Sequence, residues 1–233
     1  MTTIVLIPGA MHGPWVFEPL LAALSERGAT AVTVDLPSIS DDTATIGSLT
    51  DDVDAIRSAV ARVEGPVVLA AHSYGGVPAR AAAAATDSVR GLVMIAAFAL
   101  PVGVSLLDAQ GGEFPPDYER SADGRGVKIG DIAETIYSDV APAVVEKALP
   151  RVQWQSVESF TQPAPAAPGP DVTITTIIAT EDKALPADQQ RQWAGSSDAR
   201  VAVASGHSPH VSHPDAVADA ILDTVRRVEA TTR

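Results

Sequence analysis

The sequence predicts an α/β protein with a mostly parallel, doubly wound sheet and an inserted, partly helical lid. Short, continuous apolar runs alternate along the chain with segments that carry apolar residues at helical spacing. Such runs are typical of strands that are buried on both faces of a sheet. The chain has 233 residues and is 46% apolar, which is enough for one sizeable core. The alternation lapses between Leu100 and Pro170, which indicates an insertion.

Six apolar runs are expected to form the strands of the sheet, because they are short, rich in β-branched residues and bounded by turn residues. They cover residues 3–7, 31–34, 67–71, 91–97, 172–179 and 200–204. The first run ends at Pro8-Gly9, and the second ends at Asp35.

Helices are expected between these strands, where apolar residues recur every three or four positions. The segments are residues 17–27, 49–63, 77–85, 187–194 and 215–229. The first stops at Gly28, the residue type that commonly follows a helix end. Each of these helices is expected to cover a face of the sheet.

The domain organisation predicted is a core made of residues 1–99 and 171–233, with residues 100–170 as a lid. The lid is rich in Gly, Pro and charge, and it shows helical spacing only near residues 132–137 and 143–149. No strand is expected in it. Its return leg, P-A-P-A-A-P-G-P at residues 163–170, is expected to be a stiff extended connector. We expect the lid to cover one end of the sheet.

Charge and composition narrow the possible partners. The formal net charge of −13 disfavours a nucleic acid or an anionic membrane. No apolar run is long enough to cross a bilayer, and no export signal is recognisable, so a cytoplasmic protein is expected. The chain has no cysteine, which excludes disulfides and thiolate chemistry.

A candidate nucleophile lies where the third apolar run meets a helix. The five residues A-H-S-Y-G (71–75) fit the pattern small-x-Ser-x-Gly in a strand-turn-helix context. This pattern presents a serine on a sharp turn, and small residues are needed at its ends because strand and helix backbones come close there. Ser73 is therefore the predicted nucleophile; the alternative is that it only caps the helix.

The predicted partners of this serine follow the last two strands. Asp182 follows residues 172–179 and His207 follows residues 200–204, so both are expected at the sheet edge that carries Ser73. His207 would act as base and acid, and Asp182 would fix its tautomer. Glu181 is the alternative acid. His210 and His213 are alternative histidines, but prolines break any helix that would align all three on a metal, and neither a metal nor a cofactor is expected.

The amide N–H groups of Tyr74 and Ala10 are the expected oxyanion donors, because one donor usually follows the nucleophile and the other lies after an early strand. His12 is expected to order the loop of Ala10. Four further side chains are expected to contact substrate beside His12, and they are Trp15, Trp154, Phe160 and His210. The lid offers further apolar surface through Leu106, Leu107, Phe114, Ile132, Ile136 and Tyr137.

Four segments resemble the α/β-hydrolase superfamily, and most closely its compact branch of plant methyl esterases and hydroxynitrile lyases. They are L-I-P-G-A-M-H-G-P-W (6–15), A-H-S-Y-G-G (71–76), T-E-D-K-A-L-P (180–186) with residues 190–193, and G-H-S-P-H (206–210). Pro8 departs from the histidine that is common there. The lid resembles this branch only loosely, so the resemblance does not set the substrate.

The resemblance implies the α/β-hydrolase fold and a serine-dependent esterase. The lyases of this branch use a threonine in the oxyanion loop and a lysine after the histidine, whereas this chain has Ala10 and Ser208. The expected function is hydrolysis of a small, largely apolar carboxylic ester or lactone through an acyl-serine. A cofactor-free lyase, cyclase or C–C cleaving enzyme and a non-enzymatic ligand receptor stay open as alternatives. The oligomeric state is also open, with a homodimer as one alternative.

Overall fold

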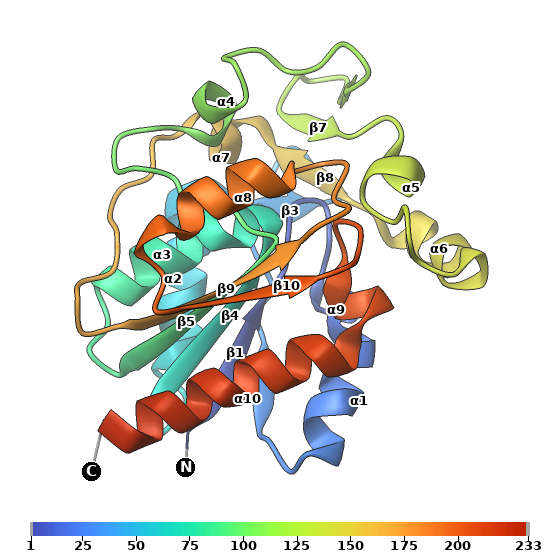
Figure 1. Cartoon of the computed structure of the whole chain (residues 1–233). Helices are drawn as coiled ribbons and strands as arrows, with labels where there is room; N and C mark the ends of the chain where they lie inside the picture. Colours follow the sequence, from blue (N-terminus) through green and yellow to red (C-terminus); the bar gives the residue numbers. More distant parts are fainter. Residues whose placement is uncertain (1, 232–233) are drawn as a thin grey trace.

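The computed structural model describes residues 2–231, and its core is a six-stranded sheet in the order β10-β9-β5-β4-β1-β2 (Figure 1). All neighbouring pairs in this sheet are parallel. The strands are β1 (Thr3–Ile7), β2 (Ala31–Thr33), β4 (Val67–His72), β5 (Val89–Ile95), β9 (Thr173–Ala179) and β10 (Ala199–Val203). The predicted fold class is confirmed.

Helices cover both faces of this sheet (Figure 1). On one face, α1 (Glu18–Glu26) and α10 (Pro214–Thr231) enclose an apolar cluster with β1, β4, β5 and β9. On the other face lie α2 (Leu49–Val60), α3 (Gly76–Ala84) and α8 (Ala187–Trp193), whose apolar side chains form a second cluster with the same strands. Strand β4 is buried at all six positions, as expected for the centre of a parallel sheet.

Strand β5 differs from its predicted range. It begins at Val89 and ends at Ile95, whereas residues 91–97 were expected. The early start comes from a pairing with β4 that begins at Val89 and shifts register at a bulge. The early end coincides with Ala96, whose φ of 43° is incompatible with an extended strand.

The lid contains strands as well as helices, which corrects the expectation that it has none. Strands β6 (Glu119–Arg120), β7 (Gly126–Lys128) and β8 (Trp154–Ser156) join β3 (Ile39–Ser40) in an antiparallel sheet ordered β3-β8-β7-β6. These strands are two or three residues long, too short to give a recognisable alternation of apolar and polar residues. The helical turns of the lid are α4 (Leu106–Ala109), α5 (Ile132–Thr135), α6 (Pro142–Ala148), η3 (Leu149–Arg151) and α7 (Val157–Thr161).

The small sheet is joined to the core through β3. Ile39 pairs with Gln155, and the Ser156 amide donates to the Ser38 carbonyl at 2.8 Å. The lid thereby lies at the end of the large sheet where the polar segments after β4, β9 and β10 meet (Figure 1). Among residues 2–231, no helix is long and apolar enough to span a membrane.

Candidate active site

Ser73 lies on a sharp turn between β4 and the short helix η2 (Ser73–Gly75), which continues into α3. Its φ of 49° is in the left-handed region, which non-glycine residues rarely adopt. The turn depends on close backbone approach, because a Cβ on Gly75 would lie 2.3 Å from the Pro8 carbonyl oxygen, and one on Gly76 would lie 2.7 Å from that of Phe98. These contacts explain why small residues surround the serine.

The structure brings Ser73, His207 and Asp182 together in one line of hydrogen bonds. His207 Nε2 lies 2.8 Å from Ser73 Oγ, and His207 Nδ1 lies 2.7 Å from Asp182 Oδ2. The imidazole and the carboxylate are both buried. With Nδ1 protonated and donating to Asp182, Nε2 is free to accept the serine proton, and the imidazolium formed would be stabilised by the carboxylate.

Asp182 is held by further donors that fix its orientation. Its Oδ1 accepts the amide protons of Ala184 and Leu185, each at 2.8 Å, and its Oδ2 also accepts from Gln190 Nε2 at 2.8 Å. The neighbouring Glu181 is exposed to solvent. Of the two adjacent carboxylates, Asp182 is therefore the one that faces the histidine.

Gln190 is a residue of the site for which no role was predicted from the sequence. Its side chain on α8 donates to Asp182, and it also accepts from the Ala179 amide at 3.0 Å and donates to the Leu185 carbonyl at 2.6 Å. It thus ties the end of β9 to the loop that carries the acid. The available signals were its position on a helix, eight residues after Asp182, and its place in residues 190–193, which belong to a segment that resembles the α/β hydrolases.

Ala10 and Tyr74, whose amides are the predicted oxyanion donors, line the same cavity as Ser73. Tyr74 is in the first turn of a helix, where backbone N–H groups have no intrahelical acceptor. The loop of Ala10 is held by His12, whose Nδ1 donates to the Ala10 carbonyl at 2.6 Å. Tyr137 of the lid donates to His12 Nε2 at 2.6 Å. Burial lowers the pKa of His12 to about 4, so this imidazole is neutral.

The remaining expected substrate contacts divide into two groups. Phe160 lines the cavity that holds Ser73.

The other four residues do not line this cavity. Trp15 lies under the Arg151 guanidinium, 4.5 Å away, in a separate hollow of about 160 Å³. Trp154 is covered by the Lys128 ammonium in the small sheet. His210 is fully buried against His72 and Phe17. His12 also lies outside the cavity lining, behind Ala10.

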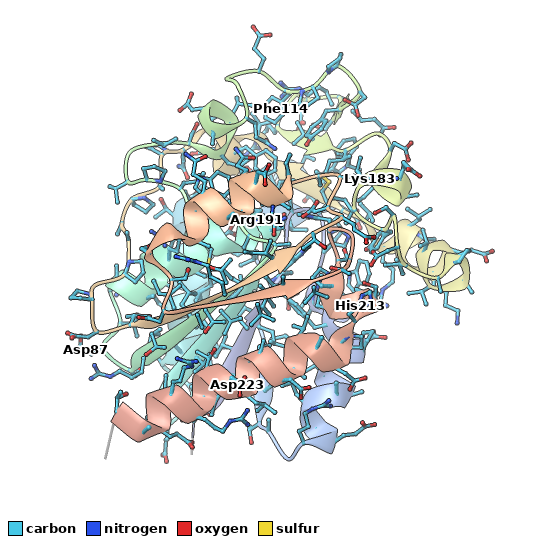
Figure 2. The ribbon with its side chains drawn as sticks, viewed as in Figure 1. Asp87, Phe114, Lys183, Arg191, His213 and Asp223 are labelled. Carbon is cyan, nitrogen blue, oxygen red and sulfur yellow. The ribbon has the colours of Figure 1, made fainter. Side chains whose placement is uncertain are left out.

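The cavity beside Ser73 and His207 has a volume of about 220 Å³. Its wall is largely apolar, and the lid supplies much of it through Leu106, Pro115, Ile129, Ile136 and Phe160. Polar side chains also contribute, among them Asp117 and Lys183, and the latter is paired with Glu134 of α5. Lys183 and Phe114 lie at the lid end of the molecule, whereas Asp87 and Asp223 lie at the far end (Figure 2). Among the described residues, no group of three His, Asp or Glu side chains could hold a metal ion.

Comparison with known proteins identifies the family of this chain. The sequence profile of the alpha/beta hydrolase family matches residues 4–220. An alpha/beta hydrolase of Aspergillus novofumigatus is 28% identical over 233 residues, with 92% of each chain covered. The pyrethroid hydrolase of Sphingobium wenxiniae is 27% identical over 247 residues, which cover 96% of this chain and 87% of that protein.

Solved structures show the same fold. A pyrethroid hydrolase from Sphingobium faniae has a TM-score of 0.79 at 24% identity, with 95% of this chain and 96% of that chain covered. A methylesterase from Arabidopsis has a TM-score of 0.84 at 19% identity, with 97% and 100% covered. Because the family profile spans nearly the whole chain, this protein belongs to the alpha/beta hydrolase family and is a hydrolase of that fold.

Proposed function

We propose that this enzyme hydrolyses a small, largely apolar carboxylic ester or lactone through an acyl-Ser73 intermediate. The observation that carries the proposal is the pair of hydrogen bonds from Ser73 to His207 and from His207 to Asp182, beside an apolar cavity. The names pyrethroid hydrolase and methylesterase, carried by two relatives in sequence or fold, support a hydrolase of this class.

The reaction follows from the positions of these groups. Ser73 Oγ attacks the ester carbonyl while its proton passes to His207 Nε2, and the amides of Ala10 and Tyr74 stabilise the oxyanion. The imidazolium then donates the proton to the leaving alcohol. A water molecule, deprotonated by His207, attacks the acyl-serine, and the acid leaves as Ser73 recovers its proton. Asp182 stabilises the imidazolium in both steps.

The cavity supports a small acyl group. A volume of about 220 Å³ lined by aromatic and aliphatic side chains favours a compact apolar group over a long chain. The chain lacks the two groups that the resemblance associates with lyases, since Ala10 carries no hydroxyl. Ser208, directly after His207, is fully buried and is absent from the cavity lining. Both observations favour hydrolysis over cyanohydrin cleavage.

The test is the intact mass of the protein after reaction with a fluorophosphonate, a reagent that phosphonylates activated serines. We expect one adduct on the wild type, none on Ser73→Ala, and one on the control Ser25→Ala, since Ser25 is exposed on α1. With p-nitrophenyl butyrate as substrate, we expect the wild type and Ser25→Ala to hydrolyse the ester and Ser73→Ala not to. An unlabelled, folded wild type, or ester turnover that survives Ser73→Ala, would contradict the proposal in favour of a receptor or a lyase.

A further inference from the structure

We propose that a buried network of Asp52, Ser38 and Gln155 positions both oxyanion donors, and that Asp52 is a positioning residue for ester hydrolysis. The inference rests on the function proposed above, because it concerns the two amides that would bind the oxyanion. The network lies outside the line of Ser73, His207 and Asp182. It connects helix α2, the segment before β3, the lid strand β8 and both oxyanion segments.

One end of the network holds Tyr74, the residue after the nucleophile. The Tyr74 hydroxyl donates to Asp52 Oδ2 at 2.5 Å, and the whole residue is buried. Its ring also packs against Phe160 of the lid. Because the phenol is anchored at its far end, the Tyr74 side chain restrains the position of its Cα, and through it the direction of the amide N–H.

Asp52 is the centre of the network. It is fully buried on α2, and it accepts from the Ser38 amide at 2.9 Å and from the Ser38 hydroxyl at 2.6 Å, in addition to Tyr74. A carboxylate in such a place is costly unless donors surround it. Burial raises the pKa of Asp52 to about 6, so the three donors face an anion at neutral pH. Its charge makes these hydrogen bonds stronger than neutral ones.

Gln155 connects the network to the other oxyanion segment. Its Nε2 donates to Ser38 Oγ at 2.9 Å and to Ser159 Oγ at 2.7 Å, while its Oε1 accepts from the Met11 amide at 3.1 Å. Met11 has a φ of 68°, in the left-handed region, and its carbonyl accepts from the Gln153 amide at 3.0 Å. The lid strand β8 and the residue before it thus hold both the amide and the carbonyl of this strained residue, and Met11 directly follows Ala10.

The path is continuous from one oxyanion segment to the other. It runs from the Tyr74 hydroxyl through Asp52, Ser38 and Gln155 to the Met11 amide, and every side chain on it is buried. Oxyanion donors act mainly on the transition state, so a support that only orients them should affect kcat more than KM. Replacing a residue that is needed only for folding would lower the stability of the protein, without lowering kcat more than it changes KM.

The experiment compares Asp52→Asn with Asp51→Asn in the full-length protein. Asp51 is the adjacent carboxylate on α2, is exposed, and takes part in the helix cap with Ser48, so its variant controls for weakening of α2. For Asp52→Asn we expect kcat on p-nitrophenyl butyrate to fall tenfold to a hundredfold with KM changed less than threefold. The rate of fluorophosphonate labelling should fall by a similar factor. Asp51→Asn should keep wild-type values for both.

A second pair of measurements guards against misfolding of Asp52→Asn. Tyr74→Phe removes one hydroxyl while retaining the ring and the amide, and it should lower kcat about tenfold. Combining it with Asp52→Asn should cost less than the product of the two single effects, because both break the same link. Wild-type kcat and labelling in either single variant, or a loss confined to KM, would overturn the inference. An unlabelled wild type would overturn the proposed function itself, and this inference with it.

Discussion

The two sheets of this molecule contribute different parts of the site. The six-stranded parallel sheet has the largely buried strands β1, β4, β5 and β9 at its centre, and the segments that follow β4, β9 and β10 carry Ser73, Asp182 and His207. The four-stranded antiparallel sheet is built from two- and three-residue strands, and the lid around it supplies the apolar wall of the cavity. From this difference we predict that the large sheet carries the reacting groups, whereas the wall residues of the lid select the substrate; Gln155 of β8 is the lid residue that we expect to support the chemistry as well.

The largest expected loss of activity comes from replacing Asp182, the acid that follows β9 of the large sheet. Asp182→Asn should lower kcat on p-nitrophenyl butyrate by about 10⁴, because an amide no longer holds His207 in the tautomer that accepts the serine proton. The exposed neighbour provides the control, and Glu181→Gln should retain wild-type kcat. Equal kcat in Asp182→Asn and wild type would assign the acid to another residue.

Gln190 tests whether a residue that only holds Asp182, and does not itself react, affects kcat. Gln190→Leu removes a hydrogen bond to Asp182, and a bond to a charged group contributes about 1.5–3 kcal/mol. We therefore expect kcat to fall about tenfold to a hundredfold, together with a lower melting temperature. Gln189→Leu changes the adjacent residue of α8 and should leave kcat as it is. A change confined to stability in Gln190→Leu would limit this glutamine to a structural role.

His12 joins the two regions, because it contacts Ala10 of the core and Tyr137 of the lid. Its pKa in the folded protein is lowered to about 4 from an ordinary 6.5, so its contribution to stability is complete above pH 6.5 and is lost as pH falls toward 4. Between pH 7 and pH 5 this amounts to about 2 kcal/mol in the free energy of unfolding. Asp52 acts in the opposite direction, since its raised pKa favours the folded state at acid pH.

Urea unfolding at pH 7 and pH 5 measures this contribution of His12 to the free energy of unfolding. The wild type should lose more stability on acidification than His12→Gln does, whereas His213→Gln, which changes a partly exposed histidine, should behave as the wild type. His72 and His210 have lowered pKa values for the same reason, so some acid sensitivity should persist in His12→Gln. An identical pH dependence in His12→Gln and wild type would remove His12 from this account.

The smallest expected effect concerns the lid wall. Ile136→Ala removes apolar surface from the cavity and should lower kcat/KM for an apolar ester about tenfold, mostly through KM. The lid residue Val144, largely exposed on α6, provides the control, and Val144→Ala should change neither constant. A loss in kcat alone for Ile136→Ala would mean that Ile136 supports the chemical step and not substrate binding.

Sequence reasoning succeeded best for the large sheet, and the reason is physical. A strand that is buried on both faces favours apolar side chains, so residues 67–71 of β4 form an unbroken apolar run, and β9 is recognisable as a run rich in β-branched residues. Parallel strands also bring the residues that follow them to one edge, which is why the sequence order predicted that Ser73, Asp182 and His207 would lie together. Fold class and family are confirmed by the structure and by the comparisons.

The lid sheet and the buried network could not be predicted in this way. Strand β8 pairs with β3, more than a hundred residues earlier, and neither is long enough to show a period. Asp52 lies in a helix whose apolar spacing says nothing about a buried carboxylate, because its burial depends on donors from Ser38 and Tyr74. Such sites depend on contacts between distant segments, which a single sequence does not encode locally.

The two ends of the described chain have a practical consequence. The Thr2 hydroxyl donates to Glu229 at 3.1 Å, so the start of β1 and the last turns of α10 are neighbours, at the end of the sheet remote from the lid (Figure 1). A short linker could therefore close the chain into a ring, and a circular permutant opened at the exposed Gly124 turn would retain every strand of the large sheet. For the same reason, immobilisation through either end would leave the cavity facing away from the support.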